Sequence, residues 1–313
     1  MSTEATAPMK ATPPTGRQVR AYFAPVERSA GTPTIFDAAV DGRFALDAPP
    51  APWVDLGCVS GFARSSATKV ETLMAGSPHT ARSQVRQTLD ATVKLEFVSW
   101  GKLQMALSTG SQHMNLPVAP MTAAAVLTGS TATCVKVGTA NVGAFAVGQM
   151  VAVDVDYAPG ATGFVGSGVS AAYVSAAAAA AIGGDSSYTR RVTLNTGRIA
   201  AVGTDSVTLE EPLPAGAPTT EMAVMPVCGF VDREGGSFFQ EWSALFVLEG
   251  EQGDRVIFYY PRLQAMEGAA ETQSALSKPL KQWGLAGSFR ALPVTDAMDG
   301  ESVLCYRSYL PAA

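Results

Sequence analysis

Charged side chains are scarce in this sequence. Asp, Glu, Lys and Arg make up 16% of its 313 residues, whereas apolar residues make up 47%. Ordinary soluble domains carry about 25% charged residues. The net charge is −5, and a dedicated nucleic-acid binder needs clustered Lys and Arg, so the composition excludes that class. The scarcity of charge also favours a surface that partner subunits partly cover.

Histidine is rare, and no two cysteines lie close together in the sequence. His79 and His113 are the two histidines, and neither has a metal-ligating residue at suitable spacing. The four cysteines are widely separated, which favours reduced, buried thiols. Asp154 and Asp156 lack a calcium loop after them, and we interpret them as a solvated face. Neither a GxSxG turn nor a P-loop is present. The sequence therefore predicts no enzyme, no catalytic residue, no cofactor and no metal site.

Long apolar runs are also missing. No stretch approaches the ~20 apolar residues that a membrane-spanning helix needs, and the alanine run at residues 176–181 is far shorter. Residues 1–14 are rich in Thr, Ala and Pro and lack the apolar segment of a secretory signal. We therefore expect no membrane partner.

Glycine and proline are abundant, with 30 and 20 copies, which indicates short strands joined by tight turns. We predict a mainly β fold, a β-sandwich or β-barrel with one flanking α-helix and an inserted small β-barrel domain. Residues 1–52 are predicted to be an extended N-terminal arm. Residues 53–120 and 228–313 are predicted to form the main β-domain, and residues 121–227 the insert.

The clearest local pattern lies in residues 82–98. Val93, Leu95 and Phe97 alternate with polar residues, which predicts a half-buried strand with these three side chains in the core. A second predicted strand, residues 67–74, precedes it, and the sequence Gly-Ser-Pro between them favours a hairpin turn.

A change to helical spacing follows this strand. Trp100, Leu103 and Leu107 fall on one face of a predicted helix that packs across the sheet. Ser99 is the expected N-cap and Gly110 the expected stop.

Later segments also read as strands. In the insert, predicted strands at residues 132–137, 149–157, 189–194, 198–202 and 206–209 surround a long loop at residues 159–185. Toward the C-terminus, residues 238–248 pair with 255–260 and residues 285–294 with 302–309 in two predicted hairpins, the second turning at Asp299-Gly300.

Three of these segments carry a family resemblance. Residues 89–110 (LDATVKLEFVSWGKLQMALSTG) resemble the strand-then-helix segment of phage major tail tube proteins. Residues 285–300 (LAGSFRALPVTDAMDG) are similar to the late hairpin of that family, and residues 253–261 (GDRVIFYYP) to the strand before it. The resemblance covers residues 50–120 and 228–310; the insert and the N-terminal arm depart from it.

The resemblance implies a structural virion protein made in the host cytoplasm. Subunits of this family stack as hexameric rings into a tail tube through which genomic DNA passes without specific binding. The implied partners are copies of the chain itself, the tape-measure protein and tail-end proteins. Unpaired strand edges would then become joints between copies by strand addition. The hairpin that reaches the next ring would include Met74, Gly76, Pro78, His79, Arg82 and Arg86.

Two alternatives remain open at this point. The Gly/Ala-rich insert is compatible with a tail or capsid decoration module that binds a host-surface glycan. A hydrolase of cell-wall polymers would need paired carboxylates in a cleft or a metal, and the sequence offers neither at recognisable spacing.

Overall fold

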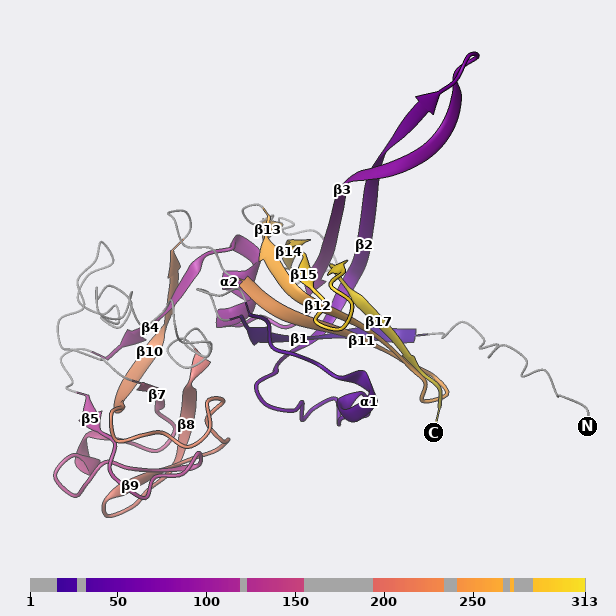
Figure 1. Cartoon of the computed structure of the whole chain (residues 1–313). Helices are drawn as coiled ribbons and strands as arrows, with labels where there is room; N and C mark the ends of the chain where they lie inside the picture. The colour runs from indigo at the N-terminus through magenta and orange to yellow at the C-terminus, as the bar shows by residue number, and fades with distance from the viewer. Residues whose placement is uncertain are drawn as a thin grey trace, which may run out of the picture.

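Antiparallel strands form most of the structure, a computed structural model that describes residues 16–26, 32–118, 123–154, 194–233, 241–266, 271–272 and 284–312. The mainly β class predicted from the sequence is confirmed. Two strand-built bodies lie side by side, and one long hairpin projects from the larger body (Figure 1).

The larger body is a β-barrel of six strands. The strand order is β14-β3-β2-β1-β11-β12, and β14 pairs again with β12, which closes the barrel. Two more strands, β13 and β17, extend the edges of β14 and β12. The bounds are β1 Gly16–Pro25, β2 Val54–Ala75, β3 Thr80–Phe97, β11 Glu241–Gly250, β12 Arg255–Ala265, β13 Glu271–Thr272, β14 Gly284–Ala291 and β17 Tyr306–Leu310.

Alternating apolar side chains fill the barrel. Val93, Leu95 and Phe97 of β3 are at most 4% exposed, as their spacing predicts. They pack in one cluster with aromatic residues from four other strands, namely Phe23, Trp242, Phe246, Tyr260 and Phe289. The burial of such aromatic groups supplies the main favourable term in folding.

Residues 32–53 cover the outer face of the barrel. This segment contains the short helix α1 (Ala38–Asp41), which Asp37 caps through its side chain. Phe36 and Trp53 pack there against Tyr259 of β12, with ring centroids 6.1 and 6.2 Å from the tyrosine. The same barrel strands therefore have apolar side chains buried on both faces.

The predicted N-terminal arm is wrong for most of its length. Residues 16–25 form β1, which pairs with β2 on one side and β11 on the other. Tyr22 and Phe23 are fully buried, on opposite faces of the strand. A strand buried on both faces shows no period-two alternation, which explains why the pattern was missed. Residues 1–15 and 27–31 lie outside the described residues.

Helix α2 (Lys102–Thr109) follows β3 and packs against the barrel core through Leu103 and Leu107, which are 3% and 1% exposed. Gly110 ends it in the left-handed conformation, as predicted. Two predictions for this segment are wrong: Ser99 does not cap the helix, and Trp100 is not part of it. The N-cap residue is Gly101, without a side-chain cap, and Trp100 lies before the helix. The Trp100 side chain is 57% exposed and lies against Phe230.

The smaller body has its own sheet, in the order β4-β10-β7-β8-β9-β6, with β5 beside β10. Its apolar core is made mostly of Val, Leu and Ile, without a residue of the barrel. The bounds are β4 Gln112–Pro117, β5 Ala124–Ala125, β6 Cys134–Lys136, η1 Val142–Ala144, β7 Met150–Asp154, β8 Thr196–Val202, β9 Ser206–Leu209 and β10 Ala223–Arg233. The boundary predicted at residue 228 falls inside β10, and the predicted strand 189–194 and loop 159–185 lie almost wholly outside the described residues.

The first late hairpin is confirmed, because β11 and β12 pair around residues 251–254. The second is wrong in its long strands. Strands β14 and β17 do not pair with each other, since both pair with β12. Only the two-residue strands β15 (Val294–Thr295) and β16 (Ser302–Val303) pair around the Asp299-Gly300 turn.

Candidate assembly surface

The outer parts of β2 and β3 form a two-stranded ribbon that leaves the barrel (Figure 1). Strand β1 pairs with β2 no further than Val59, and β14 pairs with β3 only from Thr92 onward. Beyond these points, β2 and β3 pair only with each other among the described residues. The ribbon, residues 63–91, therefore offers unpaired backbone groups on both outer edges, which strand addition can use.

Exposed apolar side chains gather on this ribbon. Of the thirteen large apolar residues that the described chain exposes, five lie here: Val70, Leu73, Met74, Val85 and Leu89, with exposed fractions of 44–59%. The register places Val85 opposite Glu71, and Leu89 opposite Thr68. Since these positions differ in parity along β2, apolar groups stand on both faces. Such a concentration marks a contact surface.

The end of the ribbon is a short turn. Gly76 has φ +98°, a conformation that a side chain would strain. Its carbonyl lies 2.5 Å from Nδ1 of His79, and the Thr80 hydroxyl donates to the carbonyl of Ala75 at 3.2 Å. Met74, Gly76, Pro78 and His79 thus lie together at the tip, where the sequence placed them. Their predicted contact with a neighbouring ring stays a prediction.

The root of the ribbon is held by contacts to the barrel. The Arg64 guanidinium donates to the hydroxyl of Tyr260 at 2.9 Å and lies 5.0 Å from the ring centre of Phe258. Phe62 packs against Phe246 with 4.9 Å between ring centroids. These contacts fix the direction in which the ribbon leaves the barrel. Sequence reasoning missed Arg64, because an arginine in a polar strand segment carries no signal of its own.

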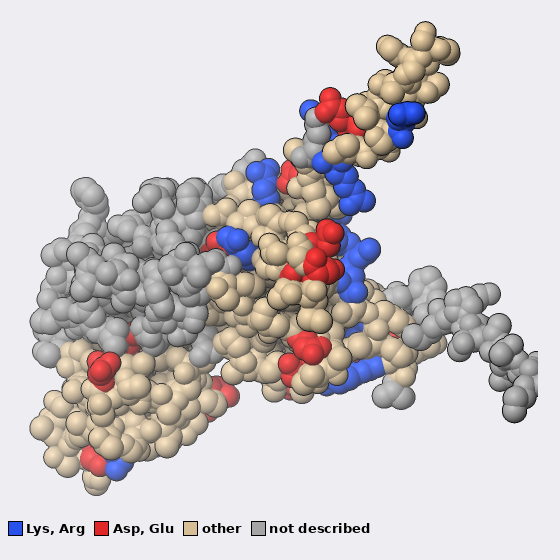
Figure 2. Space-filling view, viewed as in Figure 1, with Lys and Arg blue, Asp and Glu red and all other residues tan. Residues whose placement is uncertain are grey.

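Positive charge accompanies the apolar residues. Between residues 67 and 88 the ribbon has Lys69, Arg82 and Arg86 against one acidic residue, Glu71. Nearer the root, Asp90 pairs with Arg290 of β14 at 3.2 Å. Figure 2 shows Lys and Arg along the ribbon and its root beside one acidic patch on the ribbon, and both acidic and basic groups on the barrel face below it. The ribbon is therefore a basic, partly apolar surface.

The described residues offer little that resembles a catalytic centre. Within them, no group of three or more His, Cys, Asp or Glu side chains is placed to hold a metal. Two predictions need correction. Asp154 is fully buried rather than solvated. None of the four cysteines is buried, since Cys228 is exposed and the other three are half-buried. Asp156 lies outside the described residues. The described part of the chain also has no helix with the length and hydrophobicity of a bilayer span.

No protein-family model matches the sequence, and no curated protein is similar to it.

Proposed function

We propose that this chain is the tail tube subunit of a long-tailed phage, a structural virion protein that polymerises as stacked, hexameric rings around a DNA conduit. The observation that carries the proposal is the ribbon of residues 63–91. Two-stranded ribbons are marginally stable alone in water. This one also exposes five large apolar side chains and two unpaired edges, which another protein surface would cover.

The rest of the fold fits a self-assembling building block. The barrel closes on itself through the β12–β14 pairing, so open edges are concentrated on the ribbon and the edge strands rather than spread around the body. An interface between unlike surfaces of identical copies generates a ring when the rotation closes and a filament when it does not. A ribbon that joins successive rings supplies the second kind of contact.

The proposed role is non-enzymatic. The partners are copies of the chain itself, the tape-measure protein and tail-end proteins, and genomic DNA passes without specific binding. The chain would be made in the host cytoplasm and reside in the virion tail. Its net charge of −5 suits a conduit for DNA, because like charge keeps a phosphate backbone from adhering.

Electron microscopy of the purified protein at high concentration, alone and with a tape-measure partner, tests the proposal. We expect rings and tubes of constant diameter. A protein that stays monomeric in both samples would contradict the proposal.

A second candidate function concerns the insert. It has an apolar core of its own and joins the barrel through the strand pair β4 and β10, as an appended binding module would. Such a module would recognise a host-surface glycan. Binding of the full chain to a glycan array would support this function, and an array without signal would remove its basis.

A further inference from the structure

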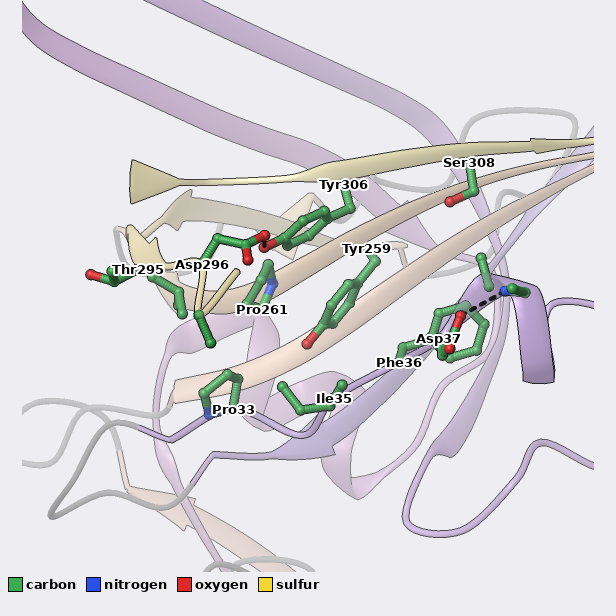
Figure 3. A pocket seen from close by; sticks show the side chains of 14 residues that line it. Pro33, Ile35, Phe36, Asp37, Tyr259, Pro261, Thr295, Asp296, Tyr306 and Ser308 are labelled. Carbon is green, nitrogen blue, oxygen red and sulfur yellow. Dashed lines mark hydrogen bonds between the residues drawn. The ribbon is translucent and has the colours of Figure 1, made fainter. Parts of the chain in front are cut away.

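A cavity of about 530 Å³ lies on the outer face of the barrel. Pockets that bind ligands commonly hold about 300–1,000 Å³. Three stretches of chain enclose it: residues 33–39, the β12 residues Tyr259 and Pro261, and residues 294–308. Figure 3 shows the rings of Tyr259 and Tyr306 and the side chains of Ile35 and Pro33 turned toward this space.

The walls of the cavity include two tyrosine rings whose hydroxyl groups are already hydrogen-bonded. Tyr259 and Tyr306 stack with 5.7 Å between ring centroids and 19° between planes. The Tyr259 hydroxyl donates to the carbonyl of Thr34 at 2.8 Å, and the Tyr306 hydroxyl donates to Asp296 at 2.6 Å. That second bond raises the pKa of Tyr306 to about 12 and lowers the pKa of Asp296. Tyr259 is 5% exposed, so the half-buried ring of Tyr306 and the side chain of Ile35 offer the accessible apolar surface.

Exposed apolar side chains lie in the cavity wall and in the residues next to it, because Ile35 lines the cavity and Val40 and Met298 directly follow the lining residues Ala39 and Ala297. Ile35, Val40 and Met298 are 73%, 76% and 94% exposed. They are three of the thirteen large apolar residues exposed in the described chain. After the ribbon, this is the second concentration of such residues, so the cavity and the residues next to it read as a contact surface.

We propose that this cavity receives the ribbon tip of a second copy of the chain, with Leu73 and Met74 packing against Ile35 and Tyr306. The inference rests on the proposed function and adds to it the site at which one copy of the chain contacts the next.

Charge complementarity selects this occupant. Residues 33–43 and 294–301 around the cavity carry five carboxylates and one arginine. The ribbon between residues 67 and 88 carries three basic residues and one acidic residue. Opposite charges around an apolar centre fix register and favour encounter.

The direction of the ribbon also requires a second copy. Figure 1 shows α1, at the edge of the cavity, on the side of the barrel away from the projecting ribbon. Although β15, which lines another edge of the cavity, lies nearer the root of the ribbon, the ribbon points away from the barrel, so its tip does not reach the cavity of its own copy. Joining tip to cavity between copies makes a head-to-tail contact, which continues into a filament when its rotation does not close into a ring.

Photo-crosslinking of the full chain tests the inference. Ile35 is replaced by the photoreactive residue benzoylphenylalanine, the protein is assembled, and crosslinked peptides are identified after trypsin digestion. Because trypsin cleaves after Lys69 and Arg82, the ribbon tip is released as residues 70–82. We expect this peptide to be the main intermolecular partner of position 35.

The outcomes separate this inference from the proposed function. Tubes in which position 35 crosslinks to other peptides overturn the tip-in-cavity contact and leave the tube intact. A sample without any assembly contradicts both.

Matched substitutions give a second test. Ile35→Lys removes an apolar group of the cavity wall and places positive charge before a basic ribbon, whereas Val147→Lys makes the same change at a 65% exposed site in the smaller body. We expect Ile35→Lys to raise the concentration needed for assembly at least tenfold and Val147→Lys to leave it unchanged, both with wild-type melting temperatures. Equal assembly of the two variants would overturn the inference.

Discussion

Strands β2 and β3 each have one part inside the barrel and one part in the projecting ribbon. The two parts differ in what their apolar side chains contact. Inside the barrel, Val93, Leu95 and Phe97 are at most 4% exposed. Beyond the barrel, Val85 and Leu89 of the same strand are 59% and 45% exposed. The backbone pairing is continuous across the boundary, with three register shifts. Apolar side chains stabilise the fold in the first part and are available to another molecule in the second.

The largest contrast is expected between Phe97→Asp and Val85→Asp. Loss of the buried ring alone costs about 3–5 kcal/mol, and a buried carboxylate adds to that cost. Since domains are stable by about 5–15 kcal/mol, Phe97→Asp should yield no soluble folded protein. Val85→Asp should fold with an unfolding free energy within about 0.5 kcal/mol of wild type. Circular dichroism of both variants measures this, and a native, soluble Phe97→Asp variant would show that the barrel register is wrong.

The pH dependence of the unfolding free energy allows the same comparison between a buried lysine, Lys102, and an exposed one, Lys69. Lys102 of α2 donates to Oδ1 of Asn115 at 2.7 Å, and burial lowers its pKa to about 7. The unfolded chain therefore binds more protons between about pH 7 and 10.5, so this group makes the unfolding free energy rise with pH across that window. The rise is at most about 1.4 kcal/mol per pH unit.

Lys102→Met removes this dependence. We expect its stability relative to wild type to be greatest below pH 7 and to decline toward pH 10. Lys69→Met, on the exposed ribbon, is the control and should follow wild type throughout. Melting curves from pH 6 to 10 measure the difference, and parallel curves for Lys102→Met and wild type would contradict the assignment.

A smaller effect is expected at the root of the ribbon. Arg64→Met loses the hydrogen bond to Tyr260 and the contact with the Phe258 ring. Because this arginine remains exposed, the cost should be about 1 kcal/mol. Arg82→Met, on the ribbon away from the barrel, should cost less than about 0.5 kcal/mol. Urea denaturation compares the two, and equal midpoints would show that Arg64 does not anchor the ribbon.

The smallest effect on stability, and the largest on assembly, is expected from shortening the ribbon. Deletion of residues 76–80 removes the turn but no barrel contact, so the melting temperature should stay within about 2 °C of wild type. Electron microscopy of this variant should show no stacked rings. Normal tubes would remove the joining role of the ribbon.

The sequence predicted the half-exposed parts of the fold better than the fully buried ones. The alternation around Leu95 revealed β3 because one face of that segment is apolar and the other polar. Strand β1 was not predicted, because residues 32–53 cover its outer face. Tyr22 and Phe23 are therefore both buried, and the segment shows no alternation of apolar and polar residues. Trp100 has helical spacing, yet the extended backbone of Gly101 delays the helix until after it.

The candidate surfaces differ in the same way. The hairpin turn near Gly76 is a local signal, so the ribbon tip could be placed from sequence. The cavity depends on Ile35 and Tyr306, which lie far apart in the sequence, coming together in the fold.

The claim that copies of the chain complete the ribbon is tested most directly by amide hydrogen exchange of residues 67–88, measured in the dilute monomer and in the assembled state. We expect fast exchange of the outer-edge amides in the monomer and strong protection after assembly, with little change in the barrel part of β3. Equal exchange of these amides in both states would contradict the claim.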